Sequence, residues 1–154
     1  MEECCGKNGP GINSTVCPLC GQAGAGVGLR TVKNQLIAHA MIRFEGDRNY
    51  LFCSNPDCQV VYFSGTLHFS KDSVRGPVYQ KDRKGSTPVC YCIGITRDAI
   101  RQEILETGNC TAAKVITAFI QKGLCACEWT NPQGSCCLGN VREEVKAALA
   151  ASGL

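Results

Sequence analysis

The sequence has no apolar run approaching the ~18 residues that a membrane-spanning helix needs. Its N-terminus has no basic region followed by an apolar stretch, so no secretory signal peptide is expected. No Ser/His/Asp arrangement, phosphate-binding loop or pair of catalytic carboxylates stands out. We therefore expect a cytoplasmic protein without hydrolytic or transferase activity, whose chemistry is electron transfer or metal reduction rather than turnover of an organic substrate.

Cysteine, in contrast, is abundant, with 13 in 154 residues. An odd number cannot pair completely into disulfides, and cysteines close in sequence are poorly placed to bridge each other but well placed to bind one ion. Very small domains usually need such a staple. We interpret the cysteines as metal ligands in a reducing compartment. They fall in five close pairs: Cys17/Cys20, Cys53/Cys58, Cys90/Cys92, Cys125/Cys127 and Cys136/Cys137.

The formal charge of +3 is weak evidence for a nucleic-acid partner because it counts every thiol as neutral. Four thiolates on Zn²⁺ carry a net charge of −2, and so do four thiolates on an oxidised [2Fe–2S] core. Two such centres would bring the formal charge from +3 to −1. We do not expect nucleic-acid binding.

Composition divides the chain into a polar tail (residues 1–14), a zinc module (15–70), a charged linker rich in Gly and Pro (71–88) and a helical module (89–154). In the zinc module, β-branched and aromatic runs at 60–63 and 67–69 flank a short turn and predict a hairpin. Residues 31–41 have helical spacing. The predicted fold class is α+β, a β-hairpin module followed by an all-α module.

Three helices are expected in the second module. Thr96 caps the first, which Gly108 ends. Thr111 caps the second, which Gly123 ends. The third opens at Ser135 or Cys136, with four apolar residues facing inward: Leu138, Val141, Val145 and Leu149.

Cys17-Pro-Leu-Cys20-Gly is a knuckle sequence whose two intervening residues let both sulfurs face one point. Cys53 and Cys58 are separated by four residues that favour a turn. Together these cysteines offer four thiolates for a closed, tetrahedral and therefore structural Zn²⁺ site. The same ligands would also accept a rubredoxin-type iron.

The second constellation begins with Cys90-Tyr-Cys92, which runs directly into the helix capped by Thr96. Alternate side chains point to one side of such a turn, so that both thiolates can bind one iron. Cys136 and Cys137 lie at a predicted helix N-terminus, where free amides and the helix dipole favour an anionic cluster.

These motifs resemble known proteins. Cys90-x-Cys92-x-Gly-Ile-Thr resembles the opening of the bacterioferritin-associated-ferredoxin type of [2Fe–2S] domain, and Cys137-Leu-x-x-Val-Arg-Glu resembles its closing ligand and helix. Residues 15–142, including Phe52-Cys53-x₄-Cys58-x-Val-Val-Tyr-Phe and Cys127-x₂-Thr-Asn-Pro-x-Gly-x-Cys-Cys137, resemble the N-terminal domain of CopZ-type iron–sulfur copper chaperones.

The resemblance implies a zinc module joined to a [2Fe–2S] module, with Cys90, Cys92, Cys127 and Cys137 as cluster ligands. It also implies a function in copper handling, in which the cluster reduces Cu(II) to Cu(I) for transfer, with a copper-transporting ATPase or another soft-metal acceptor and a redox protein as partners. Two departures matter. These residues contain no Met-x-Cys-x-x-Cys copper loop, and nine residues separate Cys127 from Cys137. Cys136 and Cys125 therefore remain alternative closing ligands.

Cys4 and Cys5 are adjacent thiols that could bind Cu⁺, since thiolates select soft ions, or could simply be free. Two other functions remain open: a small ferredoxin unrelated to copper, and a redox-sensing binding module.

Overall fold

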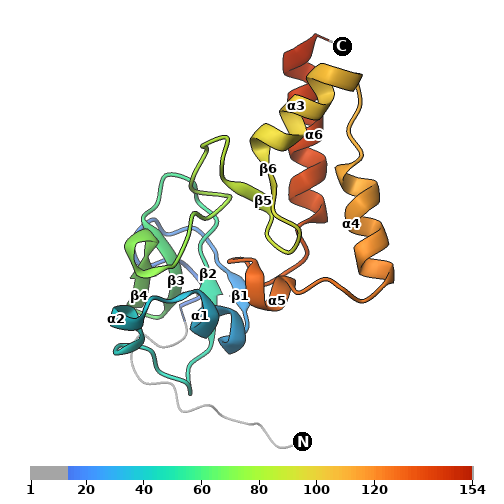
Figure 1. The fold of residues 1–154 in the computed structure, drawn as a ribbon. Coiled ribbons are helices and arrows are strands. Elements are labelled where there is room, and N and C mark those ends of the chain that lie inside the picture. Colours follow the sequence, from blue (N-terminus) through green and yellow to red (C-terminus); the bar gives the residue numbers. More distant parts are fainter. Residues whose placement is uncertain (1–13, 154) are drawn as a thin grey trace, which may run out of the picture.

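Four short strands form an antiparallel meander in the first half of the chain (Figure 1). The computed structural model describes residues 14–153. The strands lie side by side in chain order: β1 (Ala25–Val27), β2 (Tyr50–Phe52), β3 (Val60–Ser64) and β4 (Leu67–Ser70). The predicted hairpin is confirmed as β3–β4, and its turn uses Gly65 at φ 61°, which other residues rarely adopt.

Every residue of β3 is buried, because the strand is covered on both faces. Val61 and Tyr62 join the main core of this unit, while Val60 and Phe63 pack in a smaller cluster with Cys17, Cys53 and Cys58. The sheet therefore separates a conventional apolar core from a cysteine-lined side.

The helix predicted over 31–41 is two helices, α1 (Leu29–Gln35) and α2 (Ala38–Met41). Leu36 and Ile37 between them are extended, since they pair with the segment that follows β4. Leu36 forms a bridge with Val74, and the Ile37 amide donates to the Ser73 carbonyl at 2.9 Å. A long-range contact thus overrides the local helical spacing.

Residues 71–88, which the sequence suggested as a solvated linker, pack against the rest of the protein. After a short 3₁₀ helix (η1, Lys71–Ser73), Val74 and Val78 are buried in the first core, and Tyr79 packs on the second. Because charged residues dominate this segment, its few buried apolar side chains were not expected from the sequence.

The second unit contains β5 (Pro88–Cys90), β6 (Ile95–Thr96), α3 (Arg97–Thr107), α4 (Ala112–Gln121), α5 (Cys127–Thr130) and α6 (Leu138–Ser152). The prediction of a purely helical module is not confirmed, because β5 and β6 pair as a small antiparallel sheet. Its core is formed by Val89, Ile100, Ile104, Ile116 and Val141, among others.

The predicted helix ends agree closely with these helices. The Thr96 hydroxyl accepts a hydrogen bond from the Ala99 amide at 3.1 Å, and Gly108 ends α3 with φ 72°. Thr111 precedes α4 but donates its hydroxyl to Glu103 instead of capping its own helix. α6 begins at Leu138, with Cys137 as its N-cap, slightly later than Ser135 or Cys136.

The two units meet where α5 packs across α1 (Figure 1). The Tyr62 hydroxyl donates to the Pro132 carbonyl at 2.6 Å, and the Thr31 hydroxyl donates to the Glu128 carbonyl at 2.7 Å. A Cβ on Gly134 would lie 2.8 Å from Thr31 Oγ1, so the backbone approaches α1 closely there. This interface places the Cys127 loop against the first unit.

Among residues 14–153, none of the helices has the length and apolar character of a membrane span.

Candidate metal centres

The first predicted set of cysteines is brought together by two loops of the sheet unit. The Cys17 amide donates to the Gln22 carbonyl at 2.8 Å and the Gly21 amide to the Cys17 carbonyl at 2.9 Å, which curls the Cys17–Cys20 knuckle. Cys53 directly follows β2 and Cys58 shortly precedes β3. The pairing of β2 with β3 therefore holds the second pair of cysteines beside the first.

The four sulfurs of Cys17, Cys20, Cys53 and Cys58 lie within 4.8 Å of one another. The Cys17–Cys58 sulfurs are 3.8 Å apart and the Cys20–Cys53 sulfurs 3.7 Å. A tetrahedral ion with metal–sulfur bonds of about 2.3 Å separates its ligands by about 3.8 Å. The four thiols therefore fit a tetrahedral Zn²⁺ and leave no position for substrate.

Their acidities differ because their surroundings differ. A backbone hydrogen bond from Gln22 and a side-chain hydrogen bond from Asn55 lower the pKa of Cys20 to about 6. Burial raises the pKa of Cys53 to about 12. One thiol of the set thus ionises readily, while another needs a cation nearby to lose its proton.

The second predicted set forms two pairs of sulfurs. Cys92 Sγ lies 3.6 Å from Cys127 Sγ, and the Cys90 and Cys137 thiols hydrogen-bond to each other. Among residues 14–153, the zinc-type set is the one group of three or more potential ligands whose donor atoms all lie within 4.8 Å of one another. The second set thus differs from the first, because its sulfurs lie in two pairs and not around a single point.

The structure separates the alternative closing ligands. The Cys137 thiol is buried and hydrogen-bonded to the Cys90 thiol, whereas its neighbour Cys136 is exposed. Cys127 reaches Cys92, whereas Cys125 makes no such contact. Cys137 and Cys127 therefore lie closer to Cys90 and Cys92 than their neighbours do, and their role as ligands stays a prediction.

Polar groups surround these sulfurs. The Ala126 amide donates to Cys92 Sγ at 3.1 Å, and Thr130 Oγ1 lies 3.2 Å from the same sulfur. Cys137 is the N-cap of α6, so its thiol lies near the positive end of a 15-residue helix. The hydrogen bond with Cys137 lowers the pKa of Cys90 to about 6.

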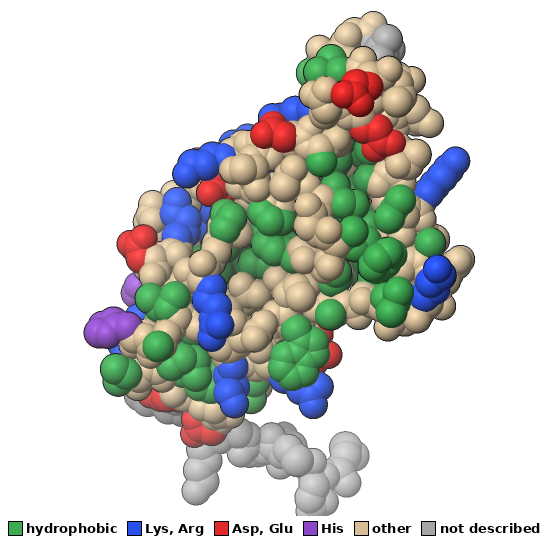
Figure 2. Space-filling model, viewed as in Figure 1, with side chains coloured by type: hydrophobic (Ala, Val, Ile, Leu, Met, Phe, Trp, Pro, Cys, Tyr) green, Lys and Arg blue, Asp and Glu red, His purple; other side chains and the backbone are tan. Residues whose placement is uncertain are grey.

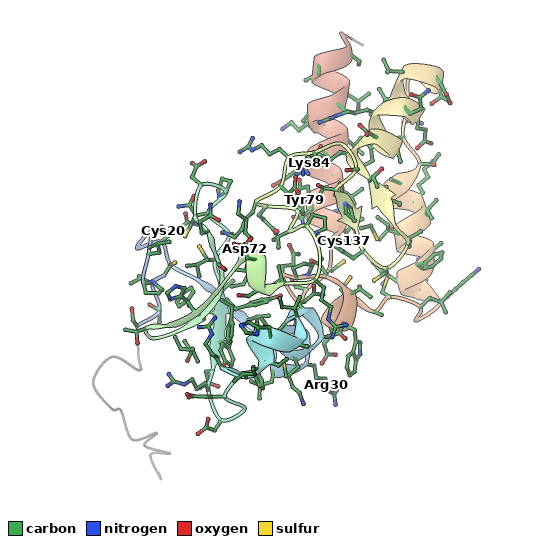
Figure 3. The ribbon with its side chains drawn as sticks, turned by 60° about the vertical axis from the view of Figure 1, so that its left-hand side comes forward. Cys20, Arg30, Asp72, Tyr79, Lys84 and Cys137 are labelled. Atoms are coloured by element: carbon green, nitrogen blue, oxygen red, sulfur yellow. The ribbon has the colours of Figure 1, made fainter. Side chains whose placement is uncertain are left out.

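The edge of the second set is open to solvent. Trp129 is 46% exposed and Leu124 is 56% exposed, and both lie within three residues of Cys127. Figure 2 shows hydrophobic side chains gathered on this face of the second unit. Cys20 and Cys137, in contrast, come from different units and lie apart (Figure 3). The two candidate centres are thus separate.

The remaining cysteines do not enlarge either set. The Cys110 thiol donates to Glu103 at 3.3 Å, at the junction of α3 and α4. Cys4 and Cys5 lie outside the described residues. Sequence reasoning missed Lys81, which lies 7% exposed beside the first set. The neighbouring Val78-Tyr79, an apolar pair within a charged run, was the available signal that this segment is packed.

Comparison with known proteins gives matches over most of the chain. Residues 14–75 match the family of CopZ-type zinc binding domains. The chain is 32% identical over 121 residues to the copper chaperone CopZ of Archaeoglobus fulgidus, covering 79% of this chain and 57% of that protein. The chain therefore spans little more than half the length of this curated relative.

The crystal structure of the A. fulgidus CopZ N-terminal domain superposes with a TM-score of 0.71 at 30% identity, covering 83% of this chain and 95% of that domain. This match extends beyond the zinc binding domain into the second unit. The chain is thus a homologue of that copper chaperone across its N-terminal domain, and its residues 14–75 belong to the family of CopZ-type zinc binding domains.

Proposed function

We propose that this protein handles copper with two thiolate centres, a structural Zn²⁺ held by Cys17, Cys20, Cys53 and Cys58 and a redox-active [2Fe–2S] cluster held by Cys90, Cys92, Cys127 and Cys137. The observation that carries the proposal is the grouping of these eight sulfurs, one set around a single point and the other in two pairs. Because the chain is similar to a copper chaperone, we infer that copper is the ion that the cluster reduces.

The zinc site has a structural role in this proposal. Its four ligands come from two loops, 17–20 and 53–58, which have few apolar side chains to hold them together. Four protein ligands leave no open position for a reaction. Metal binding supplies folding free energy to this side of the sheet.

The second centre has the redox role. When bound, a [2Fe–2S] cluster supplies one electron at a time. One electron from the reduced protein converts one Cu(II) to Cu(I), which leaves the protein oxidised, and a redox partner protein then supplies another electron to reduce it again. Cys92 and Cys127 are themselves partly exposed, which gives the centre the access to solvent that such exchange needs.

We further propose that residues 15–70 and 89–154 are the two functional modules, with 71–88 as their packed connection. Thiolates stay unoxidised in a reducing compartment, so we expect the protein to work in the cytoplasm. There the Cu(I) product would pass to a copper-transporting ATPase or another soft-metal acceptor.

The test measures how many Cu(I) ions form per chain. Protein purified anaerobically and reduced with one electron per chain is mixed with Cu(II) and a Cu(I)-selective chromogenic chelator. We expect about one Cu(I) per chain, together with loss of the electron paramagnetic resonance signal of the reduced cluster. A Cys92→Ser variant, which lacks a proposed cluster ligand, is the control; it should form about one Cu(I) per chain less than the wild type, because only free thiols remain to reduce Cu(II).

A second candidate is a small ferredoxin whose partner has no connection with copper. It is favoured by the exposed apolar residues Leu124 and Trp129, which lie close to Cys127 in sequence. Fast reduction of a protein acceptor, with no reduction of Cu(II), would select this candidate instead.

A further inference from the structure

Within the part of the chain that the structure describes, Lys81 is a buried cation without a carboxylate partner. Its side chain is 7% exposed, and its ammonium donates to the Asn55 carbonyl at 2.7 Å and to the Cys58 carbonyl at 3.1 Å. Among residues 14–153, no carboxylate oxygen lies within 4.0 Å of this nitrogen. The charge therefore meets only neutral oxygens, both of them in the loop that carries Cys53 and Cys58.

An uncompensated buried charge is costly, so buried cations are normally paired with an anion. Arg97, the other buried cation of this region, follows the rule, since its guanidinium binds the Glu144 carboxylate at 2.8 Å. Among residues 14–153 Lys81 has no such partner, and both of its acceptors belong to the loop that carries two of the four thiols. Four thiolates on one Zn²⁺ carry a net charge of −2, which would supply the missing anion.

We propose that Lys81 is the counter-ion of the zinc tetrathiolate, a positioning residue that holds the 54–57 loop and neutralises part of the site's negative charge. The inference rests on the proposed zinc centre and adds to it a residue from outside the matched zinc binding domain, which ends at residue 75.

The turn that contains Lys81 is also held by hydrogen bonds within residues 78–82 and by Arg97 of the second unit. The Lys81 and Asp82 amides both donate to the Val78 carbonyl, at 2.9 and 2.8 Å. Arg97 donates to the Tyr79 carbonyl at 2.8 Å and to the Asp82 carbonyl, and its guanidinium lies 4.5 Å from the centre of the Tyr79 ring. Residues 78–82 therefore link the zinc loop to the start of α3 in the second unit.

The test compares zinc retention by Lys81→Met with retention by Lys84→Met, which removes the same charge from an exposed position three residues away. Zinc-loaded proteins are titrated with a chromogenic zinc chelator, and folding is checked by circular dichroism. We expect Lys81→Met to bind zinc about tenfold more weakly or worse, as for loss of other groups that support metal ligands. Lys84→Met should match the wild type.

Lys81→Arg separates charge from packing, because it keeps the cation on a side chain of similar length. Recovery of most of the zinc affinity in Lys81→Arg supports the counter-ion role. A folded Lys81→Met protein with wild-type zinc affinity would overturn it, as would Lys81→Arg losing as much affinity as Lys81→Met. If the wild-type protein itself binds no zinc, the zinc centre fails, which is a different outcome from failure of Lys81 alone.

Discussion

Single side chains decide which cysteines can share an ion. Cys136 and Cys137 are neighbours in sequence, yet one is exposed and the other is buried against Cys90. Cys125 and Cys127 differ in the same way, since only Cys127 reaches Cys92. The spacing of two cysteines in the sequence therefore does not determine which of them faces a third cysteine. That depends on the backbone conformation around each pair.

Paired serine substitutions test this assignment. Cys127→Ser and Cys137→Ser should lose the visible absorption and the iron of the cluster, because each leaves one iron with a single thiolate and the cluster with three. Their matched controls, Cys125→Ser and Cys136→Ser, should keep both. Iron analysis after anaerobic reconstitution is the measurement, and loss of iron in Cys136→Ser with retention in Cys137→Ser would reverse the assignment.

A second prediction concerns Tyr62, whose hydroxyl is buried and donates to the Pro132 carbonyl. Tyr62→Phe leaves that buried carbonyl without its donor, which typically costs about 1–3 kcal/mol. We expect the free energy of unfolding, measured with chemical denaturant, to fall by this amount while zinc content is unchanged. An unchanged unfolding midpoint would mean that this hydrogen bond does not stabilise the contact between the units.

At the scale of elements, local signals in the sequence located most helix ends. Thr96 and Gly108 mark both ends of α3 because capping depends on a few adjacent residues. Local signals failed where distant segments compete. Leu36 and Ile37 are extended because residues 73–74 pair with them. The linker was mistaken for solvated chain because its charged composition outweighed Val74 and Val78.

The cysteine sets also separate what local sequence predicts from what depends on long-range packing. Close spacing identified Cys17 with Cys20 and Cys90 with Cys92 as candidate ligands. It could not show that Cys90 pairs with Cys137 and Cys92 with Cys127, because these contacts depend on how β5, α5 and α6 pack. Lys81 was missed for the same reason, since its two acceptors lie more than 20 residues away in sequence.

Glu103 connects α3 to α4, and its charge gives a prediction about pH. Its carboxylate accepts hydrogen bonds from the Thr111 hydroxyl at 2.7 Å and the Thr111 amide at 2.9 Å, and these lower the pKa of Glu103. A lowered pKa in the folded state stabilises the protein above the unfolded pKa of about 4.3, and that stability is lost as the pH falls through the folded value.

We therefore expect Glu103→Ala to lower the melting temperature at pH 7 by about 2 °C, a small effect because the hydrogen bonds between Glu103 and Thr111 lie at the protein surface. The difference from the wild type should shrink as the pH falls below about 4. Glu143→Ala, an exposed position on α6, is the control. A difference between Glu103→Ala and the wild type that does not change with pH would contradict the role of the charge.

At the scale of the whole molecule, the two units share an interface but no candidate ligand. α5 lies across α1, and Gly134 approaches Thr31 too closely to accept a side chain. The cluster set and the zinc set are otherwise built from separate segments. The protein is therefore expected to load each metal centre independently while unfolding as a joined structure.

Loss of one zinc ligand tests this independence. Cys53→Ser should lose its zinc and become less stable to heat, because Zn²⁺ binding supplies folding free energy to loops 17–20 and 53–58. Its iron content should remain at the wild-type level, since no cluster ligand has changed. Loss of both metals together would show that the two centres assemble as one unit.

The central claim, that eight cysteine sulfurs hold two kinds of metal centre, is tested most directly by measuring metal content per chain. Anaerobically purified and reconstituted protein is analysed for iron and zinc by mass spectrometry. The account predicts two iron ions and one zinc ion per chain. A protein that contains neither metal and has these cysteines joined in disulfides would contradict it.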